Sequence, residues 1–250
     1  MSILLMAHRG ANRQATENTL TAFRLALEAG CDGCECDVQL SRDGTLVVFH
    51  DETLQRLAGL ARTVPELTVS QLAALRLHDP AQRRGSGDAG IPTLQAIWQL
   101  HRERRKHLLV ELKYFRESHT SRERLCEAVS SFVEREGVTE QLYAISFDEL
   151  LLEWLKARHP ALRTGYIFSD PTRFAQHQDD CPHWADVVLP RADCVTDDLT
   201  AWARRVARPL YVWVADDALT MTRLAGLGVS GLLSNEPARL VAWAKQQPDP

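Results

Sequence analysis

Residues 33–40 read Gly-Cys-Glu-Cys-Asp-Val-Gln-Leu, a short run that we interpret as a buried strand. Side chains alternate between the two sides of a strand, so Glu35 and Asp37 face the same side. Seven further β-prone runs occur along the chain, and stretches with helical periodicity separate them. The predicted strands are residues 3–7, 33–40, 107–112, 141–147, 163–168, 186–189, 209–214 and 231–234.

The stretch after the first strand illustrates the helical pattern. Over residues 19–29, Phe23, Ala26 and Leu27 recur at helical spacing, and Gly30 follows as a residue at which helices commonly stop. Further helices are predicted over residues 93–101, 121–136, 149–158, 171–178, 196–207, 218–227 and 238–245. Eight strands, each followed by a helix, within 250 residues predict a (β/α)8 TIM barrel rather than an open doubly wound sheet.

One interval interrupts the alternation of strands and helices. Residues 45–50 have the pattern of an extra strand, and residues 51–90 follow with helical fragments and a glycine-rich segment. We therefore predict one domain over residues 1–250 with a small insertion, residues 51–90, after the second strand. Inserted segments of this kind lie at the carboxyl-terminal face of a barrel, where they help to build the active site.

The composition excludes several classes of partner. A formal charge of −4 argues against the broad cationic surface that nucleic acids require, so we expect no nucleic-acid partner. Charged residues interrupt every apolar run, which predicts no stable membrane insertion. The first ten residues lack the pattern of a signal peptide, and we expect a cytoplasmic protein. Cys31, Cys34 and Cys36 lie close together but lack a second ligand pair, and we interpret them as core residues.

Polar residues of five types fall at the predicted carboxyl ends of strands. Because these ends meet at one face of a barrel, we expect their side chains to lie together. They are His8 and Arg9 after the first strand, Glu35 and Asp37 in the second, Glu111 and Lys113 at the third, and His50 after the extra strand.

The residue types in this set favour phosphoryl transfer over acyl or hydride transfer. Neighbouring carboxylates repel one another unless a cation balances them, and Mg²⁺ or Ca²⁺ is the natural choice because both take carboxylate oxygens as ligands. A buried salt-bridge network without a metal is the alternative. Two histidines near neutrality are suited to general acid–base catalysis, and Arg9 offers a planar fork to a phosphate.

Sequence signatures of other enzyme classes are missing. The Gly-x-Gly-x-x-Gly spacing occurs at residues 85–90 and 226–231, but neither run joins a predicted strand to a following helix, as a dinucleotide motif would. The chain contains no Gly-x-x-x-x-Gly-Lys-Ser/Thr phosphate loop. It also contains no Gly-x-Ser-x-Gly nucleophile elbow. Nucleotide-cofactor chemistry and serine-hydrolase chemistry therefore lose their usual support.

The order of the motifs resembles the glycerophosphodiester phosphodiesterase family over nearly the whole chain. The resemblance continues through Ser146-Phe147-Asp148 and Val212-Trp213-Val214 to the carboxyl-terminal segment. The motifs that carry it are His8-Arg9-Gly10, Glu17-Asn18-Thr19, Glu35-Cys36-Asp37, His50-Asp51 and Glu111-Leu112-Lys113.

This resemblance implies a metal-dependent hydrolase acting on a small-molecule glycerophosphodiester, which it splits into sn-glycerol 3-phosphate and an alcohol. It implies one divalent cation, Mg²⁺ or Ca²⁺ with Mn²⁺ as a further option. The sequence leaves the oligomeric state open between a monomer and a homodimer, since barrels of this size occur as both. The implied roles are metal binding by Glu35, Asp37 and Glu111, acid–base catalysis by His8 and His50 in unassigned order, and substrate binding by Arg9 and Lys113. Phe147 and Trp213 lie near strand ends, and we interpret them either as substrate-binding residues that line the pocket or as barrel packing.

The sequence alone leaves three points open. Glu17 is interpreted either as a residue that orients His8 or the metal site, or as an acidic opening of the first helix. Ser230 and Asn235 stand where the family more usually has aspartates. The alternatives to the leading function are a lysophospholipid or other phosphodiester hydrolase with the same site, and a non-catalytic barrel that binds phosphate ligands.

Overall fold

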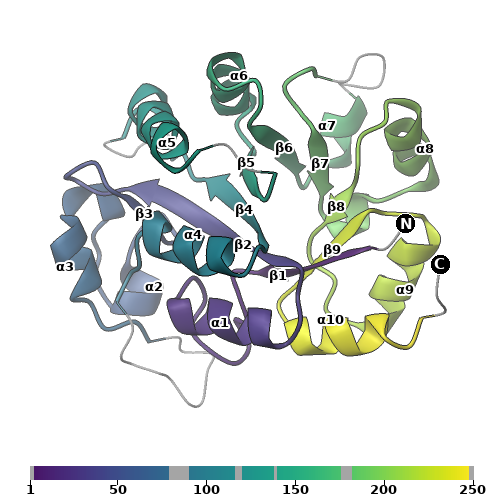
Figure 1. Cartoon of the computed structure of the whole chain (residues 1–250), viewed down its shortest axis with the longest axis horizontal. Coiled ribbons are helices and arrows are strands. Elements are labelled where there is room, and N and C mark those ends of the chain that lie inside the picture. Colours follow the sequence, from purple (N-terminus) through teal and green to yellow (C-terminus); the bar gives the residue numbers. More distant parts are fainter. Residues whose placement is uncertain (1–2, 79–89, 116–119, 138–139, 176–181, 248–250) are drawn as a thin grey trace.

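Eight parallel strands with helices packed around them form the frame of the molecule (Figure 1). The computed structural model describes residues 3–78, 90–115, 120–137, 140–175 and 182–247. The strands are β1 (Leu4–His8), β2 (Gly33–Leu40), β3 (Leu46–Val48), β4 (His107–Leu112), β5 (Leu142–Ser146), β6 (Arg163–Phe168), β7 (Val187–Pro190), β8 (Tyr211–Val212) and β9 (Gly231–Ser234).

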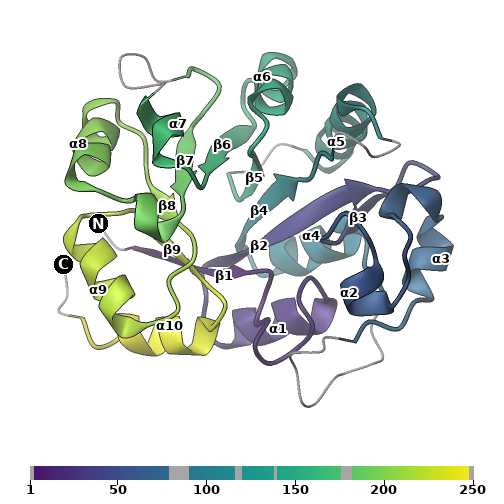
Figure 2. The same ribbon diagram turned by 180° about the vertical axis from the view of Figure 1, so that it is seen from behind.

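The helices follow the strands in alternation, and they lie on the outside of the sheet in both ribbon views (Figures 1 and 2). They are α1 (Leu20–Glu28), α2 (Gln55–Ala58), α3 (Val69–Ala73), α4 (Leu94–Glu103), α5 (Arg122–Glu136), α6 (Glu149–Arg158), α7 (Pro171–Ala175), α8 (Asp197–Arg205), α9 (Ala218–Gly226) and α10 (Pro237–Ala244), with 3₁₀ turns at Val64–Glu66 and Ala192–Cys194.

The strand order confirms the predicted TIM barrel. Strands run in the order β7, β6, β5, β4, β2, β1, β9, β8, all in parallel, while the short β3 pairs antiparallel with the end of β2. Backbone hydrogen bonds from Val188 to Pro209 (3.0 Å) and from Trp213 to Pro190 (3.2 Å) bring β8 back beside β7. Parallel neighbours need crossover connections, which the outer helices supply.

Side-chain caps fix where most of the crossover helices begin. A hydroxyl or carboxylate just before the helix accepts a hydrogen bond from a backbone N–H of the first turn, which is otherwise unpaired. The capping residues are Thr19 for α1, Thr93 for α4, Ser121 for α5, Asp148 for α6, Thr196 for α8 and Asp217 for α9.

The bounds of β2, β4, β6, β9 and α6 are those predicted from the sequence. The strand predicted over residues 209–214 is regular only at Tyr211–Val212, although Trp213 still bridges to Arg191. Of the helix predicted over residues 171–178, the structure has Pro171–Ala175 and residues 176–178 lie outside the described part.

Hydrophobic side chains fill the barrel and the layer between strands and helices. Met6, Leu109, Ile145 and Leu233 belong to a cluster inside the ring of strands. The outward side chains of β2 pack instead under the helices, in a cluster that includes Cys31, Cys34 and Cys36. The cysteines are therefore buried core residues, as predicted, and burial raises the pKa of each thiol.

The segment between β3 and α4 has a small core of its own. Its described part contains α2 and α3, which lie beside β3 on one flank of the barrel in both ribbon views (Figures 1 and 2). Phe49, Leu54, Leu57 and Leu72 are fully buried there and pack in one cluster with Ile91, just before α4. This packing attaches the segment to the end of β2.

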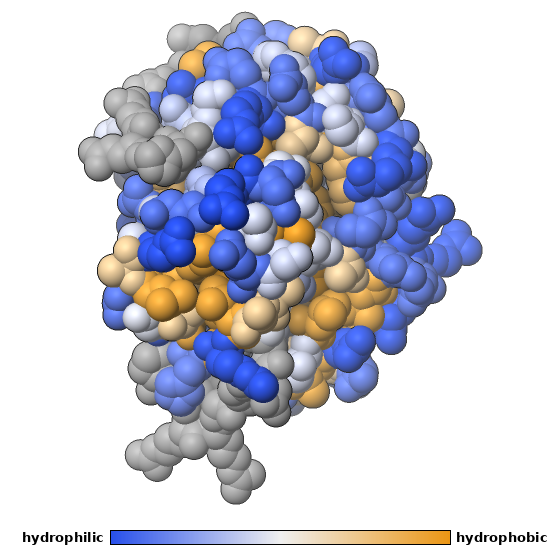
Figure 3. Space-filling model, turned by 90° about the vertical axis from the view of Figure 1, so that its left-hand side faces the viewer, coloured by the Kyte–Doolittle hydropathy of each residue, from blue (hydrophilic) through white to orange (hydrophobic). Residues whose placement is uncertain are grey.

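Hydrophilic side chains frame hydrophobic patches on the flank that carries α3 (Figure 3). Among the residues that the structure describes, no helix combines the length and the apolar character needed to cross a bilayer.

The close approach of β2 to β4 makes a testable prediction about packing. A Cβ atom at Gly33 would overlap the carbonyl oxygen of His107 and lie 2.7 Å from its Cβ. We expect Gly33→Ala to lower the free energy of unfolding by about 1–3 kcal/mol, the usual cost of overpacking. Gly226→Ala is the control, because nothing lies within 4 Å and alanine favours helix. Equal urea-unfolding curves for the two variants would contradict this prediction.

Candidate active site

Strand register brings the predicted polar residues to one end of the barrel. His8 on β1 pairs with Glu35 on β2, and Asp37 on β2 pairs with Glu111 on β4. Beside them opens a pocket with about 400 Å³ of empty space. Its lining is His8, Arg9, Glu35, His50, Glu111, Lys113, Ile145, Phe147, Ile167, Leu189, Trp213 and Leu233.

Three carboxylates form the most acidic group in this pocket. Oxygen atoms of Glu35, Asp37 and Glu111 lie within 4.8 Å of one another, and all three side chains are buried. Burial, together with the charges of Asp37 and Glu111, raises the pKa of Glu35 well above its usual range. Burial also raises the pKa of Glu111, although Lys113 opposes that shift. The group could hold a metal ion.

Two cationic side chains already compensate part of the negative charge of these carboxylates. Lys113 Nζ lies 2.5 Å from Glu111 Oε1 and 3.0 Å from Asp37 Oδ1, and Arg9 Nε lies 3.1 Å from Asp37 Oδ2. Burial alone would raise the pKa of Asp37, but Lys113 and Arg9 outweigh it and hold that pKa well below its usual range. Glu35 Oε1, by contrast, is buried and accepts no hydrogen bond from any residue that the structure describes. A divalent ion fits this donor set, because it would supply the missing partner.

His8 sits between the carboxylates and the end of β9. Its Nδ1 lies 2.8 Å from Asn235 Oδ1, and its Nε2 lies 3.9 Å from Glu35 Oε2. Burial, assisted by the positive charge of Arg9, lowers the pKa of His8 to about 4. The imidazole is therefore neutral at physiological pH in the protein alone.

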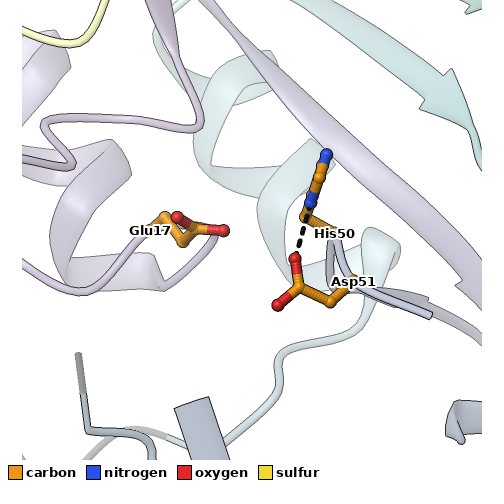
Figure 4. A group of neighbouring side chains, drawn as sticks. All are labelled: Glu17, His50 and Asp51. Carbon is orange, nitrogen blue, oxygen red and sulfur yellow. Dashed lines mark hydrogen bonds and ion pairs between the residues drawn. The ribbon is translucent and has the colours of Figure 1, made fainter. Parts of the chain in front are cut away.

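His50 reaches the same pocket from the end of β3, and its partner is a carboxylate. His50 Nδ1 lies 2.7 Å from Asp51 Oδ1 (Figure 4). The backbone on both sides of His50 is fixed by Gln39, whose Nε2 donates to the carbonyl oxygens of Phe49 (2.9 Å) and Asp51 (2.8 Å).

Glu17 lies across from His50 and Asp51, on the loop before α1 (Figure 4). Atoms of these three side chains also lie within 4.8 Å of one another, but Arg56 already forms ion pairs with both carboxylates. The Arg56 guanidinium donates to Glu17 Oε1 at 2.6 Å and to Asp51 Oδ2 at 2.6 Å. Glu17 also accepts a hydrogen bond from Arg9 at 3.3 Å, so its described contacts are with the two arginines rather than with His8.

Phe147 and Trp213 form an aromatic corner at the pocket. Their rings meet edge to face with centroids 5.8 Å apart, and Lys113 Nζ lies 6.0 Å from the centre of the Phe147 ring. Phe147 is 45% exposed, whereas Trp213 is anchored by a hydrogen bond from its Nε1 to the carbonyl oxygen of Leu189. The pocket thus has a charged side and an apolar side.

Four residues that touch the site received no role from the sequence. Asn18 donates to Asp37 Oδ2 at 2.7 Å, and Arg56 bridges Glu17 and Asp51. Asp216 contacts Asn235 behind His8, and Gln39 holds the His50 backbone. Two of them carried a usable signal: Asn18 lies in a family motif, and Gln39 continues the alternation of Glu35 and Asp37.

Comparisons with known proteins show what the chain as a whole is similar to. The chain is 29% identical over 248 residues to the glycerophosphodiester phosphodiesterase of Caldanaerobacter subterraneus subsp. tengcongensis, covering 96% of this chain and 97% of the relative. A solved glycerophosphodiester phosphodiesterase from Agrobacterium tumefaciens superimposes with a TM-score of 0.78 at 26% identity, over 97% of this chain and 100% of that chain. An Oleispira antarctica phosphodiesterase, solved with its product sn-glycerol-3-phosphate, gives a TM-score of 0.85 at 22% identity over 97% of each chain.

The model of the Glycerophosphoryl diester phosphodiesterase family matches residues 8–239. That range runs from the histidine that ends β1 into α10, and it includes every residue discussed for the pocket. The chain therefore belongs to the glycerophosphoryl diester phosphodiesterase family.

Proposed function

We propose that this protein hydrolyses glycerophosphodiesters to sn-glycerol 3-phosphate and an alcohol, using one divalent cation and two histidines. The observation that carries the proposal is the pocket itself, which two imidazoles, two carboxylates and two cationic side chains line. The third carboxylate, Asp37, lies within 4.8 Å of the other two. This combination suits a phosphodiester, whose cleavage needs charge neutralisation at the phosphate and proton transfer at two oxygens.

Glu35, Asp37 and Glu111 would hold the cation, since Mg²⁺, Ca²⁺ and Mn²⁺ all accept carboxylate oxygens. When bound, the ion would polarise the phosphate oxygens and offset their charge. The unpaired Glu35 Oε1 supports this assignment. Arg9 and Lys113 border the same pocket and add positive charge that stabilises the negative charge developing on the phosphate.

His8 and His50 would transfer the protons. One imidazole takes the proton of the glycerol hydroxyl that attacks phosphorus, and the other gives a proton to the departing alcohol. The first product is a cyclic phosphate, which water then opens with the roles of the two groups reversed. Both side chains line the pocket, and each has its Nδ1 in contact with another side chain, Asn235 for His8 and Asp51 for His50.

The apolar side of the pocket suits the carbon skeleton of a small substrate. Phe147 and Trp213 supply flat surfaces there, and Ile145, Ile167, Leu189 and Leu233 complete the wall. Large exposed hydrophobic side chains in the described residues are limited to Phe147, Leu150 and Leu219, all outside the insertion predicted over residues 51–90. A lysophospholipid would benefit from an apolar lip on that insertion, and we rank it second because the sequence of residues 51–90 is mainly polar.

The histidine pair provides the direct test. We expect His8→Ala and His50→Ala each to lower kcat by about 10²–10⁴-fold, the usual contribution of general acid–base catalysis. Release of glycerol 3-phosphate from a panel of glycerophosphodiesters, followed with a coupled assay, measures this. His183→Ala, an exposed histidine outside the pocket, is the control and should match the wild type. Full activity of either pocket variant would refute catalysis by the histidines. A wild type that cleaves none of the glycerophosphodiesters would refute the proposed substrate class.

The metal requirement is tested by binding as well as by activity. We expect EDTA to abolish turnover, with recovery on addition of Mg²⁺, Ca²⁺ or Mn²⁺. Glu35→Gln should weaken the metal affinity at least about tenfold in isothermal titration calorimetry, because it removes a charged ligand. Glu28→Gln, an exposed carboxylate on α1, should bind metal as the wild type does. Undiminished turnover in EDTA would exclude a metal role.

Arg56 is expected to support catalysis from outside the pocket lining, because it holds Asp51 and Glu17 in place beside His50. We expect Arg56→Ala to lower kcat by about 10–100-fold, as for other residues that orient catalytic groups. Arg56→Lys should retain only part of the wild-type kcat, since lysine lacks the planar guanidinium that contacts both carboxylates. Arg62→Ala removes a nearby exposed arginine paired with Glu66 and should leave kcat unchanged. Equal kcat values for Arg56→Ala and Arg62→Ala would contradict this role.

A further inference from the structure

A chain of hydrogen bonds connects Asp216 to His8 through Asn235. Asn235 Nδ2 donates to Asp216 Oδ2 at 2.8 Å, and the Asn235 backbone N–H donates to Asp216 Oδ1, also at 2.8 Å. On its other side, Asn235 Oδ1 lies 2.8 Å from His8 Nδ1. Asp216 stands in the loop after β8 and Asn235 directly follows β9, so this chain joins two strand ends behind the imidazole.

The chemistry of the partners fixes the direction of every bond in this chain. A carboxylate can only accept, so the amide nitrogen of Asn235 must face Asp216 and its oxygen must face His8. Asn12 Nδ2 also donates to Asn235 Oδ1, which supports the same orientation. An amide oxygen can only accept as well, and His8 Nδ1 therefore carries the hydrogen.

The second ring nitrogen of His8 is then the one without a hydrogen. His8 Nε2 lies 3.9 Å from Glu35 Oε2, beyond hydrogen-bond distance, and the imidazole lines the pocket. We infer that Asp216 and Asn235 are positioning residues that hold His8 in the tautomer with Nδ1–H and a bare Nε2, so that Nε2 receives the proton of the attacking hydroxyl. The inference rests on the proposed function for the proton-transfer step, but the tautomer is a property of the resting protein.

This arrangement explains why residue 235 is an asparagine rather than an aspartate. An aspartate at this position would accept from His8 equally well, but it would set its carboxylate against that of Asp216. Asn235 satisfies both neighbours, since its amide donates on one side and accepts on the other. His50 differs, because its Nδ1 partner is the Asp51 carboxylate rather than an amide oxygen.

The tautomer can be read directly by NMR on the protein labelled with ¹⁵N-histidine, with the His8 signals identified by their loss in His8→Gln. We expect the wild type to show a protonated Nδ1 and an unprotonated Nε2 at His8. Asn235→Ala should mix the two tautomers and lower kcat by about 10–100-fold, with KM changed by less than about twofold, because the loss concerns the chemical step. Asp216→Ala, which frees Asn235 to rotate, should do the same to a smaller extent.

An exchange of the two residues separates positioning from simple packing. Asn235→Asp alone should lose activity because two carboxylates then face each other, whereas Asp216→Asn combined with Asn235→Asp restores a donor opposite an acceptor. We expect the double variant to recover most of the wild-type kcat. Asp217→Asn is the control, since Asp217 caps α9, asparagine caps equally well, and kcat and Tm should not change.

Several results would overturn the inference. A resting His8 with the hydrogen on Nε2 contradicts it whether or not the protein is active. Wild-type kcat in Asn235→Ala also contradicts it, as does a double variant no more active than Asn235→Asp alone. If Asn235→Ala does not fold, the His8 tautomer is measured in Asp216→Ala instead. An unchanged tautomer in that variant would contradict the positioning role of Asp216 and Asn235. An inactive wild type with the expected tautomer would refute the proposed function and leave the positioning of His8 intact.

Discussion

The burial of three carboxylates at one end of the barrel is the constraint on which the site depends. Like charges repel strongly away from water, and such a group persists only if positive and donor groups surround it. The loop between β1 and α1 provides these groups at a conformational cost. Arg9 and Asn18 both adopt positive φ, which for a residue other than glycine costs about 1–2 kcal/mol. In return, Arg9 and Asn18 both reach Asp37.

Because the carboxylates and their cations lie together, the pocket has one charged side and one apolar side. Carboxylates and their cations gather at β1, β2 and β4, whereas the opposite wall, from β5 through β9, offers aliphatic and aromatic side chains. Lys113 stands where the sides meet, in contact with Glu111 and 6.0 Å from the Phe147 ring centre. For the proposed glycerophosphodiester, this division would favour one orientation, with the phosphate beside the cations and the neutral part beside the apolar wall.

Sequence patterns predicted the strands of the barrel better than the segments that connect them. Buried parallel strands such as β2 and β6 are continuous β-prone runs between turn signals, and their bounds agree with the prediction. The helices α2 and α3 are only 4 and 5 residues long and depend on tertiary packing around Leu54 and Leu72, which no local periodicity reveals. Arg56 and Asp216 were missed for the same reason, because their partners lie on segments that only the folded chain brings near.

Strand β2 shows how one local pattern organises most of the site. Glu35, Asp37 and Gln39 follow one another at a spacing of two residues and share the inward side, while Cys36 and Val38 between them face the helices. The first two supply carboxylates, and Gln39 clamps the backbone on both sides of His50. A shift of one residue in the pairing of β2 would turn all three outward. The position of His50, although it comes from the segment beyond β3, is therefore set by the same register that places the carboxylates.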